Sequence, residues 1–117
     1  MADLIFYHNP RCSKSREVLK LLEDNDQDFS TFLYLNENLN HVDLASLLDR
    51  LGISARELLR KNEDDYKSNN LKNIELGNKE LIEFMIQFPK IIERPILDNG
   101  IKAVIGRPPE KILELLV

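Results

Sequence analysis

The stretch from residue 8 to residue 16, His-Asn-Pro-Arg-Cys-Ser-Lys-Ser-Arg, contains the only cysteine of the chain, Cys12. None of the nine residues is acidic. Four basic or titratable residues lie within four positions of this cysteine: His8, Arg11, Lys14 and Arg16. A thiol is nucleophilic only as the thiolate, and positive neighbours and a helix N-terminus both favour that form. The stretch therefore predicts an activated thiol with a pKa below the ~8.5 of a free cysteine.

The residues that follow Cys12 limit the kind of cysteine chemistry. A Cys-x-x-Cys dithiol is absent because Ser15 stands at its second position, and the phosphatase pattern Cys-x5-Arg is absent because Val18 stands there. The spacing of cysteine and histidine predicts no metal site, and no glycine-rich loop indicates a nucleotide. Two interpretations remain. Cys12 is either a small buried hydrophobe or a monothiol nucleophile that needs an outside thiol.

The elements predicted around Cys12 place it between a strand and a helix. Residues 3–7 are apolar and aromatic and predict a buried strand, residues 13–23 predict a helix, and residues 29–35 predict a second strand. Two short strands that flank one helix favour a parallel pair with a right-handed crossover. The first N–H groups of the helix have no helical acceptor, so they can face an anion.

The middle of the chain, at about residues 37–90, predicts a helical block. A stripe of leucines predicts a first helix that ends at Gly52: Leu44, Leu47, Leu48 and Leu51. Residues 54–57 match a capping box and predict a second helix, which buries Leu58 and Leu59 and carries Arg60. A further stripe follows residues 77–78 and ends at Pro89: Leu81, Phe84, Met85 and Phe88.

The C-terminal part predicts a hairpin and a last helix. Residues 95–98 and 102–105 flank Asn99-Gly100, a strong hairpin signal, and residues 106–110 begin a helix. Four apolar residues are expected to pack that helix down: Ile112, Leu113, Leu115 and Leu116. Arg94 precedes Pro95, which favours an extended Arg94 and allows a cis bond. Taken singly, Arg60, Arg94 and Arg107 are typical of surface ion pairs.

The bulk composition is typical of a soluble globular protein rather than a disordered one. The chain has 117 residues, 43% of them hydrophobic and 31% charged, and a net charge of −4. No apolar run approaches the ~20 residues that span a bilayer. The N-terminus has no basic region of the kind that opens a signal peptide, so we expect a cytoplasmic protein. The negative charge argues against nucleic acid as a partner, but it leaves room for a local pocket that binds a small anion.

Four motifs in order resemble the ArsC family, the glutaredoxin-linked arsenate reductases. They are residues 8–16, residues 58–62 (Leu-Leu-Arg-Lys-Asn), residues 93–96 (Glu-Arg-Pro-Ile) and residues 106–110 (Gly-Arg-Pro-Pro-Glu). The resemblance implies a thioredoxin-like α/β fold of β-α-β, helical insertion and β-β-α, with a mixed central sheet. We therefore expect one domain over residues 1–117 with the insertion at about 37–90. The chain ends about ten residues after Arg107 of the last motif, as in the short, YfgD-type members.

The resemblance also implies roles for individual residues. Cys12 would be the nucleophile and His8 would help to activate it, while three arginines would bind the oxyanion: Arg60, Arg94 and Arg107. Pro95 would be a cis proline that faces the site, and Asn9, Ser15 and Arg16 would support it. The implied reaction forms a thiol-arsenate adduct on Cys12, which glutathione and glutaredoxin resolve to arsenite. No tightly bound cofactor is implied, and glutathione is a co-substrate.

Two other functions stay open at this point. One is a regulator of the Spx type, which binds RNA polymerase. Ser15 in place of a second cysteine disfavours a redox-switched form of such a regulator, and the three arginines favour an enzyme. The other is a monothiol or glutathione-dependent oxidoreductase that acts on a different anion.

Overall fold

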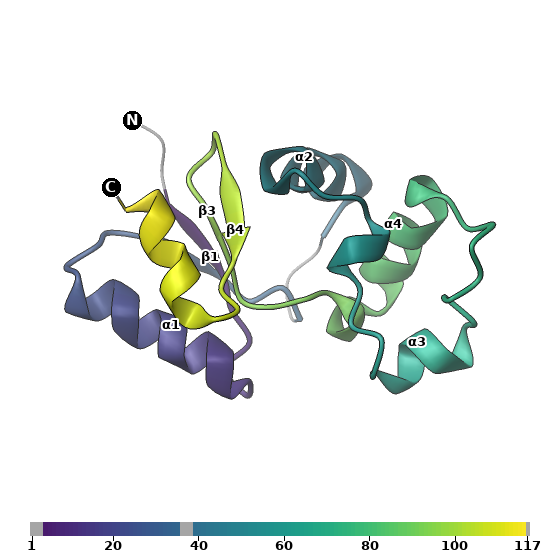
Figure 1. Ribbon diagram of the computed structural model, residues 1–117, viewed down its shortest axis with the longest axis horizontal. Coiled ribbons are helices and arrows are strands. Elements are labelled where there is room, and N and C mark those ends of the chain that lie inside the picture. The colour runs from purple at the N-terminus through teal and green to yellow at the C-terminus, as the bar shows by residue number, and fades with distance from the viewer. Residues whose placement is uncertain (1–3, 36–38, 117) are drawn as a thin grey trace. The chain divides into compact units, whose positions relative to one another are not determined.

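The computed structural model describes residues 4–35 and 39–116, and its contacts divide the chain into two compact units (Figure 1). The sheet unit comprises the described parts of Met1–Glu37 and Arg94–Val117, and the helical unit comprises those of Asn38–Glu93. That the whole chain forms one domain with an insertion at about residues 37–90 stays a prediction.

The sheet unit contains four short strands in the order β2-β1-β3-β4. Their bounds are β1 Ile5–Tyr7, β2 Ser30–Phe32, β3 Ile96–Asp98 and β4 Ala103–Ile105. Strand β1 pairs in parallel with β2 and antiparallel with β3, and β3 pairs antiparallel with β4. The predicted parallel pair, hairpin and mixed sheet are thus confirmed. The second strand is shorter than the predicted 29–35, and Asp3 of the first lies outside the described residues.

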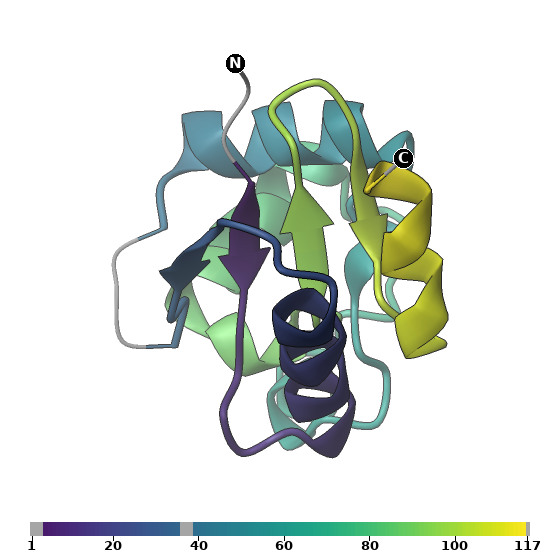
Figure 2. The same cartoon turned by 90° about the vertical axis from the view of Figure 1, so that its left-hand side faces the viewer.

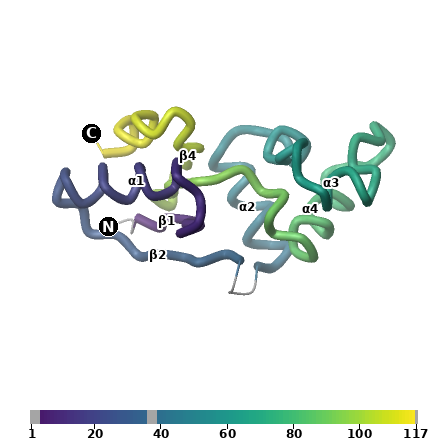
Figure 3. Tube along the Cα trace, turned by 90° about the horizontal axis from the view of Figure 1, so that it is seen from below, coloured from purple at the N-terminus to yellow at the C-terminus, as the bar shows by residue number. Residues whose placement is uncertain are grey.

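One face of this sheet carries the core of the unit. Helix α1, Ser13–Asp24, connects β1 to β2, as Figure 3 traces, and confirms the predicted first helix. Phe6 of β1 and Leu97 of β3 are direct cross-strand partners, so their side chains lie on the same face. Figure 2 shows α1 in front of these strands. The fully buried core side chains come from the sheet, from α1 and from the C-terminal helix: Phe6, Leu97, Val18, Leu22 and Ile112.

The C-terminal helix is a 3-10 helix, Pro109–Leu115. Pro109 and Ile112 are buried and Leu115 is half-buried, which matches the three-residue period of a 3-10 helix. Leu113 falls between these positions and is 38% exposed. The prediction that Leu113 packs inward is therefore wrong, because it assumed the period of an α-helix.

Two of the helices predicted for the helical unit are confirmed. Helix α2, His41–Leu51, begins after Asn40, whose Oδ1 accepts the N–H of Asp43 at 2.8 Å, and ends at Gly52 with φ of 71°. Helix α4, Asn78–Gln87, contacts α2 and is followed by a 3-10 turn, Pro89–Ile91. A short helix α3, Asp64–Ser68, precedes α4 in the chain. None of the helices within residues 4–35 and 39–116 is long and apolar enough to cross a membrane.

The second predicted helix of this unit is only one 3-10 turn, Arg56–Leu58. Leu59 is extended and forms an isolated antiparallel bridge with Ile92. The N–H of Arg60 then donates to the Ile91 carbonyl at 2.7 Å. This pairing between distant segments overrides the local capping signal, so the prediction that Arg60 lies on a helix is wrong. Leu58 and Leu59 are buried, as predicted.

Candidate active site

Cys12 is the N-cap residue of α1 and has an extended backbone, with φ of −92° and ψ of 125°. The turn before it is fixed by Asn9, whose carbonyl accepts the N–H of Cys12 at 2.9 Å and whose Oδ1 accepts the N–H of Arg11 at 3.1 Å. This geometry directs the backbone N–H groups of Lys14 and Ser15 at the thiol. The negative charge of the thiolate is therefore stabilised by N–H groups that have no acceptor within the helix.

The thiol of Cys12 has a pKa below its ordinary value, as predicted. Burial raises the pKa, but four other effects together outweigh it: the Ser15 N–H, the hydrogen bond from the Arg94 side chain, the Lys14 N–H and the charge of Arg94. Nη2 of Arg107 lies 3.5 Å from the sulfur and is a further cation beside it. Each of these donors stabilises the thiolate more than the thiol.

The two arginines beside the sulfur are held by the β3–β4 end of the sheet. Nε of Arg107 donates to the carbonyl of Arg94 at 2.6 Å, and the N–H of Gly106 donates to the carbonyl of Pro95 at 2.8 Å. The Arg94–Pro95 peptide is cis, as the resemblance implied, and the Arg107–Pro108 peptide is cis as well. A Cβ atom on Gly106 would lie 2.8 Å from Cγ2 of Val18, so α1 approaches closely only because residue 106 is glycine.

His8 lies at the end of β1 and is tied to α1 by a buried hydrogen bond. Its Nδ1 is 2.6 Å from Oγ of Ser15, and the same oxygen accepts the N–H of Asn9 at 3.0 Å. The ring of Phe6 stacks on the imidazole with centroids 4.8 Å apart. Burial, and then the charge of Arg16, lower the pKa of His8 below its ordinary 6.5. His8 is therefore neutral near pH 7.

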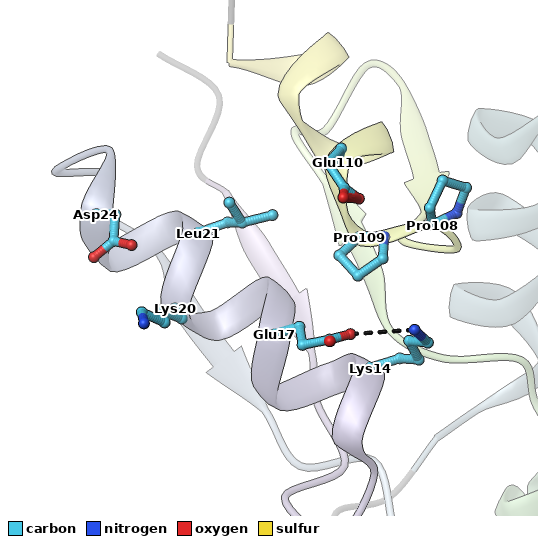
Figure 4. A pocket seen from close by; sticks show the side chains of 8 residues that line it. All are labelled: Lys14, Glu17, Lys20, Leu21, Asp24, Pro108, Pro109 and Glu110. Atoms are coloured by element: carbon cyan, nitrogen blue, oxygen red, sulfur yellow. Dashed lines mark ion pairs between the residues drawn. The ribbon is translucent and has the colours of Figure 1, made fainter.

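The basic side chains next to Cys12 in the sequence do not supply the charge at the sulfur. Lys14 pairs with Glu17 at 3.5 Å (Figure 4), Nη1 of Arg16 donates to the Pro10 carbonyl at 2.9 Å, and Arg11 is exposed. The side chain that lowers the thiol pKa comes instead from Arg94, far along the chain. The interpretation that local positive side chains activate the thiol is corrected in this respect.

A pocket of about 410 Å³ lies between α1 and the start of the C-terminal 3-10 helix (Figure 4). Its lining mixes positive, negative and apolar side chains: Lys14, Glu17, Lys20, Leu21, Asp24, Pro108, Pro109 and Glu110. Cys12 is not among them, so this pocket does not hold the sulfur.

Arg60 belongs to the helical unit, where its Nε lies 3.9 Å from Oε2 of Glu63. The sheet unit alone brings together the other predicted site residues: Cys12, His8, Asn9, Ser15, Arg16, Arg94, Pro95 and Arg107. In the part of the chain that the structure describes, no group of three His, Cys, Asp or Glu residues could hold a metal ion. The roles of all these residues stay predictions.

Comparisons with known proteins agree with this geometry. Residues 7–115 match the model of the ArsC family. The chain is 50% identical over 111 residues to the uncharacterized protein YfgD of Escherichia coli K12, covering 94% of this chain and 93% of YfgD. It is 46% identical over 114 residues to an arsenate reductase of Haemophilus influenzae, covering 97% and 98% of the two chains.

A solved structure shows the same fold. The arsenate reductase from Vibrio cholerae has a TM-score of 0.93 at 39% identity, and the match covers 97% of each chain. The expected thioredoxin-like α/β fold is thereby confirmed. Because the family model matches residues 7–115, which are almost the whole of this chain, the chain belongs to the ArsC family.

Proposed function

We propose that this protein reduces arsenate to arsenite with glutathione and glutaredoxin, through a covalent adduct on Cys12. One observation carries the proposal: a thiol of lowered pKa lies beside the guanidinium groups of Arg94 and Arg107. This arrangement supports a nucleophile and oxyanion donors at one place in the sheet unit. The arsenate reductases among the relatives support arsenate as the oxyanion.

In the first step the Cys12 thiolate attacks the arsenic of arsenate. A sulfur–arsenic bond forms, and one arsenate oxygen takes up protons and leaves as water. Arg94 and Arg107 bind the remaining oxygens with charge-assisted hydrogen bonds, which neutralise the negative charge around arsenic. The backbone N–H groups of Lys14 and Ser15 keep the sulfur in the thiolate form before the attack.

In the second step the thiolate of glutathione attacks the sulfur of Cys12. The sulfur–arsenic bond breaks and its electron pair stays on arsenic, which is reduced from the +5 to the +3 state and leaves as arsenite. A disulfide between Cys12 and glutathione remains. The thiolate of glutaredoxin takes the glutathionyl group and restores the Cys12 thiolate. An outside thiol is required because the sequence holds no second cysteine.

The remaining predicted residues support this site in the proposal. His8, Asn9 and Ser15 hold the turn that presents Cys12, Arg16 secures the Pro10 carbonyl, and the carbonyl of Pro95 holds the N–H of Gly106 next to Arg107. The resemblance adds Arg60 as a further oxyanion-binding residue. The reaction needs a reducing compartment, so the proposal includes the cytoplasm.

A coupled assay tests the proposal. The purified protein is mixed with arsenate, glutathione, glutaredoxin, glutathione reductase and NADPH, and NADPH consumption is followed. We expect consumption that depends on arsenate, that is lost in Cys12→Ser and that persists in Ser13→Ala, a change at an exposed neighbour. Folded protein that consumes no NADPH with arsenate contradicts the proposal. Consumption with another reducible oxyanion only would favour the alternative oxidoreductase.

A further inference from the structure

The hydroxyl of Ser15 has an unusual position for the first turn of a helix. Ser15 is fully buried, whereas its neighbours Ser13 and Lys14 are exposed. Its Oγ has two hydrogen-bond partners in the described structure, the N–H of Asn9 at 3.0 Å and Nδ1 of His8 at 2.6 Å. The hydroxyl therefore joins the end of β1 to the start of α1.

The proton of this hydroxyl has one acceptor within reach. A serine hydroxyl donates one hydrogen bond and accepts up to two. The Asn9 N–H can only donate, so it uses an acceptor position of Oγ. Since a buried hydroxyl proton without a partner is unfavourable, the proton of Ser15 must point at Nδ1 of His8. Nδ1 then acts as an acceptor and carries no proton of its own.

We infer that Ser15 is a positioning residue that holds neutral His8 as the tautomer with its proton on Nε2. The groups that face the imidazole agree with a neutral ring. Phe6 stacks on its face, and the positive charge of Arg16 opposes a second charge there. Burial acts in the same direction, because it disfavours the imidazolium form.

This tautomer changes how His8 can assist Cys12. With Nδ1 occupied and Nε2 already protonated, neither nitrogen can take the thiol proton. His8 instead supports the thiolate indirectly, because the hydrogen bonds of the Ser15 hydroxyl with His8 and with the Asn9 N–H fix the turn in which the Asn9 carbonyl accepts the Cys12 N–H. The consequence for catalysis rests on the proposed function, but the tautomer itself does not.

Nuclear magnetic resonance of the ¹⁵N-labelled full chain tests the tautomer directly. The two histidines are told apart with His8→Asn, which removes one set of imidazole signals and leaves those of the exposed His41. At neutral pH we expect a single His8 tautomer protonated on Nε2 in the wild type and in Ser13→Ala. In Ser15→Ala we expect a mixture of both tautomers. A wild-type proton on Nδ1, or an unchanged single tautomer in Ser15→Ala, overturns the inference.

A second measurement separates an acceptor role of His8 from a base role. The pKa of Cys12 is obtained from the pH dependence of its alkylation rate in His8→Asn and in His8→Ala. The amide oxygen of asparagine can stand near the position of Nδ1 and accept from Ser15, but it cannot take a proton at neutral pH. We expect His8→Asn to keep the lowered pKa and His8→Ala to raise it. An equal effect of the two substitutions on folded protein contradicts the inference. Since no arsenate is present, this result is independent of the reductase assay.

Discussion

Replacing Gly106 by alanine tests how the sheet unit holds the segment that carries Arg107. The added Cβ would lie 2.8 Å from Cγ2 of Val18, 3.0 Å from Cγ of Pro95 and 3.3 Å from Cγ2 of Ile112. Carbon atoms pack best at ~3.5–4.0 Å, so all three contacts are repulsive. Val18 is β-branched and sits in α1, where one rotamer dominates, and the proline ring has little freedom. The neighbours therefore cannot move aside without shifting the backbone.

The expected loss of stability follows from two opposing effects. Overpacking of a close-packed core costs about 1–3 kcal/mol. Alanine also restricts the unfolded chain, which returns about 0.4–1 kcal/mol. The net loss in the free energy of unfolding then lies between about 0 and about 2.6 kcal/mol, with about 1.3 kcal/mol at the midpoints of the two ranges. For a chain of 117 residues, each kcal/mol lowers Tm by roughly 4 °C, so we expect Tm to fall by about 5 °C.

Gly77→Ala is the matched control, measured by thermal denaturation under the same conditions. A Cβ atom on Gly77 meets only Oε2 of Glu80, at 3.0 Å, and this atom is the far end of a flexible side chain. We expect its free energy of unfolding to change by about 0.5 kcal/mol or less. If Gly106→Ala melts at the wild-type temperature, or if the two variants lose the same stability, the close approach of α1 to residue 106 is refuted.

Three further predictions concern charge and pH. Arg107→Met should raise the pKa of Cys12 and Arg11→Met should not, because Arg107 lies 3.5 Å from the sulfur whereas the side chain of Arg11 is exposed. Alkylation rates as a function of pH check this, and equal pKa values in the two variants contradict it. Because the pKa of His8 is lowered in the folded state, the unfolded state takes up the imidazole proton at a higher pH than the folded state does. Stability should therefore fall as pH drops below 6.5 and stop falling below the folded pKa. Denaturant titrations of the wild type and His8→Asn measure how the free energy of unfolding depends on pH, and this dependence should be weaker in the variant. The lowered pKa of Cys12 also makes stability increase with pH. The wild type should gain stability relative to Cys12→Ser as pH rises from the folded pKa to the ~8.5 of a free cysteine, and a constant difference between the two proteins would argue against a stabilised thiolate.

The elements that could be predicted from the sequence are those whose pattern is local. The stripes of α2 and α4 have the helical period, and Asn99-Gly100 marks the hairpin, with Gly100 at a φ of 88°. Residues 56–60 could not be predicted in this way. The chain leaves the 3-10 turn at Leu59, where it becomes extended and forms a bridge with Ile92, a residue far away in sequence. A capping box reports only on the first turn, and here only one turn forms.

In the candidate site, too, only the features with a local sequence signal could be predicted. That Cys12 follows a strand and opens a helix was predictable, because both signals lie within a few residues of it. The arginines were identified only through the resemblance, since no spacing rule links residue 94 or 107 to residue 12. Lys14 was wrongly expected to act as a positive neighbour of the thiol, because its ion-pair partner, Glu17, lies just beyond the basic stretch. The tight packing at Gly106 has no local signal, because it is set by Val18 and Pro95 from other elements.

The covalent chemistry of Cys12 can be measured directly by intact mass spectrometry. The protein is incubated with glutathione and arsenate but without glutaredoxin, so that the disulfide between Cys12 and glutathione accumulates. We expect a gain of one glutathionyl mass that requires arsenate, is absent in Cys12→Ser and disappears when glutaredoxin is added. An unmodified protein, or a gain of mass that is the same with and without arsenate, would contradict the proposed reduction of arsenate through a Cys12 adduct.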